Sequence, residues 1–203
     1  MIEVLTGLVL ASAAGLNAYI PLLGLGLLSR FTELVALPDG WAWLENTWVL
    51  VILGVLLAIE MLVDKVPALD TVNDVLHTVI RPASGGLVFA AGASSETVAV
   101  TDPAAFVSSQ NWWPFVIGIL VALVPHLLKM ISRPVLNAVT GGAGAAVAST
   151  AEDVGAVTLT VLAVIVPVLA LLLLVGLVVW LSLRLRRALR KREAARLAAR
   201  ASV

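Results

Sequence analysis

Long apolar runs separated by short polar stretches dominate the chain. A helix needs about 20 mostly apolar residues to cross the roughly 30 Å hydrocarbon core of a bilayer, and six runs come near this length. The pattern therefore predicts an all-α fold, a polytopic membrane helix bundle of about six membrane segments. The third and fifth runs are short and rich in small residues, so they either span the membrane or form re-entrant hairpins. The six runs are Ile2–Leu28, Trp48–Val63, Ala83–Val100, Trp113–Ile131, Val135–Val154 and Gly155–Ser182.

Two of these runs contain residues that weaken a helix. In the first run, "AAGLNAYIPLLG" places Asn17 and Tyr19 between Gly15 and Pro21. Glycine and proline loosen a helix, and a run of this length exceeds what the membrane requires, so we expect a break near Asn17. In the sixth run we expect a kink at Pro167.

Composition supports a membrane location. Hydrophobic residues make up 61% and charged residues 13% of the 203 positions, which leaves too little polar surface for a soluble globule. Cysteine is absent, which excludes disulfides and thiol catalysis. The N-terminus lacks the positive region of a signal peptide, so we expect its apolar run to remain as a membrane helix. We divide the chain into one transmembrane domain, 1–182, and a basic tail, 183–203.

The distribution of basic residues predicts an orientation, because Lys and Arg favour cytoplasmic loops. Eight of the thirteen basic residues lie between Arg184 and Arg200. Six crossings with a cytoplasmic N-terminus place Lys65, Arg81, Lys129, Arg133 and the tail inside, and only Arg30 outside. We therefore predict a multi-pass membrane protein with both termini in the cytoplasm. The outer interface then carries a cluster of tryptophans, Trp41, Trp43, Trp48, Trp112 and Trp113, while Trp180 marks the inner one.

Two Arg-Pro pairs each precede a helix of small residues. Aligning "GGLVFAAGASSETV" (85–98) with "GGAGAAVASTAEDV" (141–154) matches the paired glycines, one alanine, the glutamates and the final valine. Each copy also follows a long apolar helix. We interpret this pattern as a degenerate two-unit repeat, with units of about 48–100 and 113–154.

An Arg-Pro followed by Gly-Gly at a helix start presents free backbone N–H groups beside a guanidinium, which suits an anion such as phosphate or carboxylate. Two simpler interpretations remain open. The small residues pack helices closely at the centre of the bundle, and the arginines anchor to lipid headgroups. The candidate anion-site residues are Arg81, Ser84, Gly85, Gly86, Arg133, Gly141 and Gly142.

The polar insert "DKVPALDTVNDVLH" carries the densest candidate chemistry. In a helix beginning after Pro67, the spacing of Asp70, Asp74, His77 and Arg81 by four, three and four residues puts all four on one face. Asp70, Asp74 and His77 would suit a divalent cation or a proton relay. The alternative is an amphipathic helix lying on the cytoplasmic interface.

Polar residues within the apolar runs are costly in lipid, so we expect them to face the bundle interior. Asn17 lies in the first run, Glu60 and Asp64 lie near the end of the second, and His126 lies in the fourth. Whether these four bind a substrate or satisfy one another is left open by the sequence.

Three stretches carry a family resemblance: "GLVLASAAGLNAYIPLL", "VDKVPALDTVNDVLHTVIRPASGGL" and the late glycine-alanine helix. Over roughly residues 3 to 180 the chain resembles a bacterial family of small membrane proteins described only as a domain of unknown function, DUF4126. The D-K-V-P-x-x-D…R-P stretch is the most distinctive part. The resemblance implies a multi-span protein of the bacterial inner (plasma) membrane and supplies no substrate.

These observations predict a small permease or flippase-like protein for a small ion or an anionic ligand. The alternatives are a non-transporting accessory subunit and, less favoured, a lipid-phosphate-modifying enzyme. No nucleophile elbow, Walker loop, zinc-protease helix, haem motif or dinucleotide motif is present, so we expect no enzymatic activity and no cofactor. We expect membrane lipids as partners, with anionic headgroups at the tail, and a homo-oligomer. Nucleic acid is disfavoured because the tail has no interleaved aromatic residues.

Overall fold

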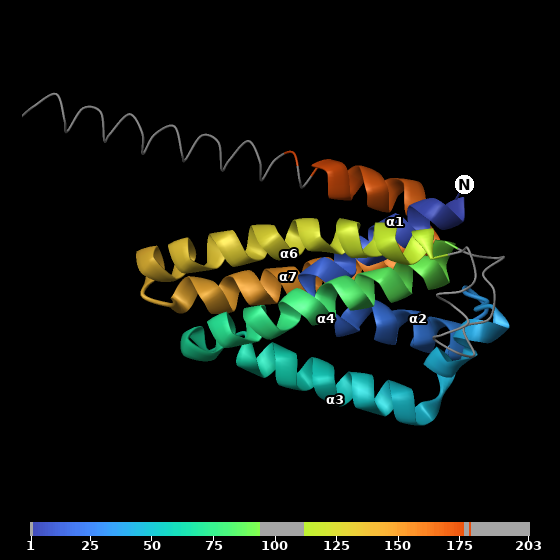
Figure 1. Cartoon of the computed structure of the whole chain (residues 1–203), viewed down its shortest axis with the longest axis horizontal. Coiled ribbons are helices and arrows are strands. Elements are labelled where there is room, and N and C mark those ends of the chain that lie inside the picture. The colour runs from blue at the N-terminus through green and yellow to red at the C-terminus, as the bar shows by residue number, and fades with distance from the viewer. Residues whose placement is uncertain (1, 94–111, 177–178, 180–203) are drawn as a thin grey trace, which may run out of the picture.

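The protein is described by a computed structural model that places residues 2–93, 112–176 and 179 (Figure 1). All secondary structure in these residues is helical. Two helices, α6 (Trp113–Thr140) and α7 (Ala143–Ile165), are long and apolar enough to cross a membrane. A third span results if the bent pair of η1 (Asp39–Glu45) and α3 (Thr47–Val63) is taken as one. The structure thus supports an all-helical membrane protein. The predicted tail, 183–203, lies outside the described residues.

The first apolar run forms two helices instead of one. Helix α1 (Ile2–Leu16) ends just before Asn17, and α2 (Tyr19–Phe31) begins two residues later, which confirms the expected break. Contacts with α7 show that the two helices form a hairpin. The Thr6 hydroxyl donates to the carbonyl oxygen of Ala163, Asn17 at the break bonds Asp153, and Gly24 lies against Thr160. The start of α1 and the end of α2 therefore lie at the same end of the bundle.

This hairpin lies at the centre of the molecule. Helix α1 packs against α4 (Pro67–Ala93), α6 and α7, and its residues from Val9 to Ala14 are buried. Helix α2 continues the core toward α3 and η1, where Trp41 and Leu44 are buried. The helix hairpin is thus formed by the first run, whereas the sequence suggested a hairpin at the third or the fifth.

Helix α3 matches its predicted bounds closely. Its run of apolar residues contains no proline, and the side chain of Asn46 caps its start by accepting a hydrogen bond from the backbone N–H of Trp48 at 2.9 Å. The apolar residues on its outer face are largely exposed, as lipid contact requires; Trp48 is 75% exposed.

The two Arg-Pro pairs do not break their helices, contrary to the prediction. Helix α4 continues through Pro82, and α6 continues through both Pro125 and Pro134. A proline inside a helix removes one backbone hydrogen bond, and in membrane bundles neighbouring helices and side chains satisfy the freed group. The polar insert from Pro67 and the third apolar run as far as Ala93 therefore form one 27-residue helix, and residues 94–100 of that run lie outside the described residues.

Glycines allow α4 and α6 to approach closely. A Cβ atom on Gly85 would collide with Ala122, and a Cβ atom on Gly118 would collide with the carbonyl of Gly85. A Cβ atom on Gly86 would lie 2.6 Å from the ring of Phe115. The small residues at 85 and 86 thus have the packing role that was one of the two open interpretations.

The second Gly-Gly pair lies in a different setting. Gly141 and Gly142 form the turn between α6 and α7, and both have positive φ angles, of 62° and 93°. The predicted segments 135–154 and 155–182 are therefore wrong in their bounds, because α7 runs from Ala143 to Ile165 and a further helix begins at Pro167. Since one Gly-Gly pair packs inside a helix and the other turns the chain, the structure does not support the aligned repeat.

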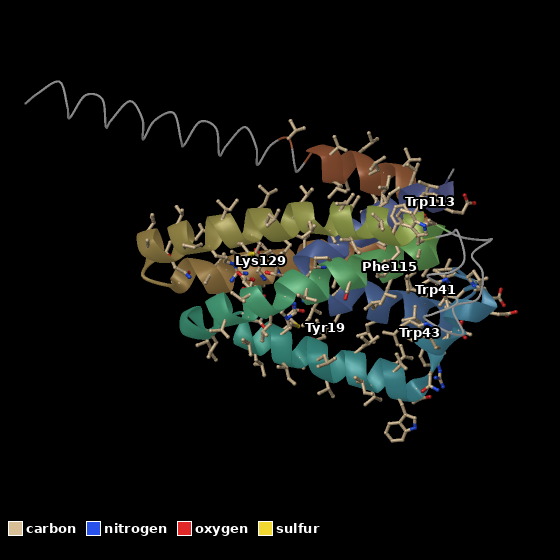
Figure 2. All side chains as sticks on the ribbon, in the orientation of Figure 1. Tyr19, Trp41, Trp43, Trp113, Phe115 and Lys129 are labelled. Carbon is tan, nitrogen blue, oxygen red and sulfur yellow. The ribbon has the colours of Figure 1, made fainter. Side chains whose placement is uncertain are left out.

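The hairpin also changes where the N-terminus lies. Figures 1 and 2 show the start of α1 at the same end of the bundle as Trp41, Trp43 and Trp113. The sequence placed the N-terminus and the tryptophans on opposite sides of the membrane. That arrangement assumed a single helix over 2–28, which the break at Asn17 replaces with a hairpin.

Candidate functional site

The end of α3, the middle of α4 and the second half of α6 bring charged side chains together inside the bundle. Arg81 of α4 is at their centre and is 0% exposed. Its Nη2 lies 3.0 Å from Glu60 Oε1 and 3.6 Å from Asp64 Oδ2, while its Nη1 lies 3.6 Å from Asp74 Oδ1. Nη1 also lies 3.3 Å from His126 Nδ1. One guanidinium thus joins three helices.

Lys129 of α6 extends this group of charges toward α7 (Figure 2). Its Nζ lies 2.6 Å from Asp64 Oδ2, 3.1 Å from Glu152 Oε2 and 3.8 Å from Asp74 Oδ1. The ammonium is therefore shared by carboxylates from three helices. Asp64, which contacts both Arg81 and Lys129, links the two cations.

Arg133 lies one turn further along α6 and closes the group. Its Nη2 donates to Glu152 Oε2 at 2.6 Å and to the Ser149 hydroxyl at 2.8 Å. The Ser149 hydroxyl in turn donates to the carbonyl oxygen of Asp64 at 2.9 Å. Helix α3 ends at Asp64, so the carbonyl oxygen of this residue has no partner within its own helix. The Ser149 hydroxyl on α7 supplies a hydrogen bond to it.

Two imidazoles border the charged groups. His77 Nδ1 lies 3.2 Å from Glu60 Oε1, and the ring of Tyr19 meets the His77 ring edge-on with centroids 5.9 Å apart. His126 Nε2 lies 3.1 Å from the hydroxyl of Thr78. Glu60 with His77, and His126 with Thr78, thus form two pairs of groups that can hold a proton, and the permanently charged guanidinium of Arg81 lies between them.

We call these nine side chains the buried ionic cluster. Three cations face four carboxylates, and with both imidazoles neutral the formal charge is negative by one. Buried charges are tolerated where opposite charges and hydrogen bonds accompany them, as they do here. The cluster comprises Glu60, Asp64, Asp74, His77, Arg81, His126, Lys129, Arg133 and Glu152.

A second polar contact lies at the hairpin break. The side-chain oxygen of Asn17 accepts the backbone N–H groups of Tyr19 and Ile20, at 3.1 and 3.2 Å, and so caps the start of α2. Its side-chain nitrogen donates to Asp153 Oδ1 at 2.9 Å. The end of the hairpin is thus attached to α7 inside the bundle.

The structure buries all four polar residues expected to face the interior. Asn17, Glu60, Asp64 and His126 are each at most 3% exposed. The predicted face of α4 is also present, because Asp74, His77 and Arg81 all turn inward. The side chain of Asp70 lies outside the described residues.

The first of the two predicted anion sites does not lie at a helix start. Ser84, Gly85 and Gly86 lie within α4, so their backbone N–H groups belong to the helical ladder. The second Gly-Gly pair does precede a helix, since Gly142 is the N-cap residue of α7, but the guanidinium of Arg133 is engaged by Ser149 and Glu152. Anchoring of Arg81 and Arg133 to lipid headgroups is also wrong, because both are buried and paired with carboxylates.

The predicted metal ligands have other partners in the described part of the chain. Asp74 faces Arg81 and Lys129, and His77 faces Glu60. No group of three His, Asp or Glu side chains among the described residues is arranged to hold a metal ion. Two hollows of about 270 and 280 Å³ lie between α2, α3 and α7, and their linings are almost entirely apolar.

Sequence reasoning missed Lys129, Ser149, Glu152 and Asp153 as site residues. Both Lys129 and Arg133 were assigned to the cytoplasmic side, Lys129 near the predicted end of the fourth segment at Ile131 and Arg133 beyond it. Continuing the helix through Pro134 puts His126, Lys129 and Arg133 at spacings of three and four, on one face. That spacing was the available signal.

The family model described as "Domain of unknown function (DUF4126)" matches residues 4–187. The chain belongs to this family. The match confirms the resemblance carried by the N-terminal and central stretches, and it includes every member of the buried ionic cluster. Comparison with curated proteins and with solved structures found no match.

Proposed function

We propose that this protein is a small-ion permease and that the buried ionic cluster forms a proton-linked path through it. One observation carries the proposal: nine ionisable side chains from three packed helices and α7 contact one another inside a bundle whose outer surface is apolar. Ionisable residues are costly within a membrane, and where they occur they commonly mark ion pathways and proton relays.

The contacts favour a proton over a larger anion. The guanidinium groups of Arg81 and Arg133 already face carboxylates of the chain, so they are not presented to an anionic ligand. Glu60 and His77 instead lie at hydrogen-bonding distance from each other, and His126 lies at hydrogen-bonding distance from the Thr78 hydroxyl, so each pair can hold a proton. Protonation of Glu60 would weaken its attraction to Arg81 and let that cation turn toward Asp64 or Asp74, which gives the cluster two charge arrangements.

The hairpin break supports the same function. Transport proteins often bind their ions where membrane helices are broken near the middle of the bilayer. In this chain the break at Asn17 lies beside the cluster, since Tyr19 contacts His77. Movement of the hairpin would therefore shift the His77 ring and so change its distance to Glu60.

For the membrane arrangement, we propose that α3, α4, α6, α7 and the segment beginning at Pro167 cross the bilayer, while α1 and α2 form a re-entrant hairpin. The end of the bundle with Lys65 and the Gly141–Gly142 turn then faces the cytoplasm, together with the basic tail and its anionic lipid partners. The N-terminus, Arg30 and the tryptophans face outward. This arrangement revises the predicted cytoplasmic N-terminus and does not require a repeat. A homo-oligomer of the bacterial inner-membrane protein remains a prediction.

The proposal is tested in liposomes that contain the purified protein, a pH-sensitive dye and a potassium gradient. Adding valinomycin drives protons inward through any open path. We expect faster acidification than in empty liposomes, and at least a tenfold loss of this flux in Glu60→Gln. Glu33→Gln, at an exposed glutamate outside the cluster, should keep the full rate.

Equal flux in wild type and Glu60→Gln would contradict the proposed path. If no variant carries flux and the protein co-purifies with a stoichiometric membrane partner, the accessory-subunit alternative is supported instead. Lipid-phosphate turnover that depends on Asp74 and His77 would support the enzyme alternative.

A further inference from the structure

The break between α1 and α2 leaves backbone oxygens without their helical partners. In an unbroken helix the N–H groups of Tyr19 and Ile20 would bond the carbonyl oxygens of Gly15 and Leu16. Here both N–H groups turn to the side chain of Asn17. The last helical partnership of α1 is that of Ala13, whose carbonyl accepts the N–H of Asn17 at 3.0 Å.

These oxygens form the C-terminal end of α1, deep in the bundle. Gly15 is buried and lies against the backbone of Ala122 and the ring of Pro125. The C-terminal end of a helix carries a partial negative charge, which favours a cation. The opposing positive end of α2 is already satisfied, because its first N–H groups are capped by Asn17.

A buried carboxylate lies at the same break. Asp153 is 7% exposed, and its Oδ1 accepts the side-chain N–H of Asn17. Its Oδ2 has no hydrogen-bond partner among the residues that the structure describes. Within those residues Asp153 also forms no ion pair, whereas Glu60, Asp64 and Asp74 each face an arginine or lysine. A carboxylate buried without a cation is costly.

We infer that the hairpin break binds a monovalent alkali cation, with Asp153 and the carbonyl oxygens of Gly15 and Leu16 as its ligands. Carboxylate and carbonyl oxygens are the ligands that hard cations prefer. Unwound backbone and half-helix C-terminal ends hold sodium ions in several transport proteins. A single positive charge neutralises Asp153, whereas a divalent ion would leave an excess charge in an apolar surrounding.

This site gives the proposed permease a second ion. Its transport role rests on that proposal, but its occupancy can be measured without any transport. A bound cation would fix Asp153, Asn17 and therefore the first turn of α2, where Tyr19 contacts His77 of the buried ionic cluster. Cation binding and the protonation of the cluster would in this way be coupled through one short segment.

The test measures the melting temperature of the detergent-purified protein in NaCl and in choline chloride at equal ionic strength. We expect sodium to raise the melting temperature by about 3 to 6 °C when its concentration exceeds Kd roughly tenfold. Asp153→Asn should lose this shift. Glu33→Gln, which leaves the break untouched, should retain it. Asp153→Glu keeps the carboxylate but changes its reach, so the sodium concentration at half-effect should rise at least threefold.

The absence of a sodium shift in the wild type overturns the inference, whether or not Asp153→Asn folds. So does a full shift that persists in Asp153→Asn. Equilibrium dialysis with radioactive sodium provides an independent readout, for which we expect one ion per chain in the wild type. Sodium binding without proton flux would retain this site and remove the permease proposal. Proton flux without sodium binding would do the reverse.

Discussion

Replacing Arg81 with methionine tests the energetic importance of the buried ionic cluster. The guanidinium lies 3.0 Å from Glu60 and 3.6 Å from both Asp64 and Asp74, and it is 0% exposed. Methionine fills a similar volume but removes the cation closest to Glu60. Lys129 still faces Asp64 and Asp74, whereas among the described residues Glu60 keeps His77 as its ion-pair neighbour. Removing one partner of a buried ion pair costs about 3–5 kcal/mol, because the remaining charge is left uncompensated.

We therefore expect Arg81→Met to lower the free energy of unfolding by about 3–5 kcal/mol. The assay is denaturant titration of the protein in mixed detergent micelles, followed by circular dichroism. The double variant Arg81→Met/Glu60→Met removes one charge of each sign. It should be more stable than the sum of the two single losses predicts, by about 1–3 kcal/mol.

Arg30→Met is the matched control. Arg30 lies at the other end of the bundle and donates to the carbonyl of Glu45 and the hydroxyl of Thr47 on the exposed surface. Its loss should cost about 1 kcal/mol or less. If Arg81→Met costs no more than Arg30→Met, or if the single losses simply add, the cluster is not held together by its charges and the reasoning fails.

Three further outcomes are expected. Gly118→Ala should lower the free energy of unfolding by about 1–3 kcal/mol, because its Cβ collides with the carbonyl of Gly85. Gly54→Ala has open space around it and should be neutral or stabilising. Equal unfolding free energies for the two variants would contradict the close α4–α6 packing. Asn17→Ala should cost about 1–2 kcal/mol through loss of the α2 cap and of the Asp153 contact, as measured in the same titration, and a neutral effect would count against the capped break. The chain contains no cysteine, so single cysteines can be labelled with an impermeant thiol reagent. The reagent should label Glu3→Cys and Trp48→Cys from one side of the membrane and Lys65→Cys from the other. Labelling of Glu3→Cys and Lys65→Cys from the same side would rule out the hairpin arrangement.

The sequence predicted the fold best where apolar runs were uninterrupted. The predicted 48–63 run matches α3 to within one residue, because neither proline nor a central charge interrupts it and Asn46 supplies a cap. The break near Asn17 was also predicted correctly, since a polar residue between glycine and proline weakens a helix locally. Both features depend on neighbouring residues along the chain.

Sequence reasoning failed where distant contacts decide the structure. Pro82 and Pro134 were taken as helix ends, although neighbouring helices stabilise α4 and α6 through both. Because of that error, the helix face shared by His126, Lys129 and Arg133 was not recognised. Lys129 and Arg133 were therefore not identified as the cations that balance Asp64 and Glu152. Likewise, nothing local distinguishes a single span over residues 2–28 from a hairpin. Partners such as Asp153, 136 positions away from Asn17, determine that the chain turns back.

The hairpin has a consequence for the order in which this protein is assembled. Its two helices are translated before α7, yet the amide of Asn17 and the hydroxyl of Thr6 find their partners on α7, separated from them by 136 and 157 positions. Until α7 has been synthesised and inserted, a polar helix break would have to stay out of the hydrocarbon, because lipid offers it no hydrogen bonds. In the proposed membrane arrangement this hairpin therefore reaches its native place only after α7 is inserted, and until then we expect it to stay near the membrane surface.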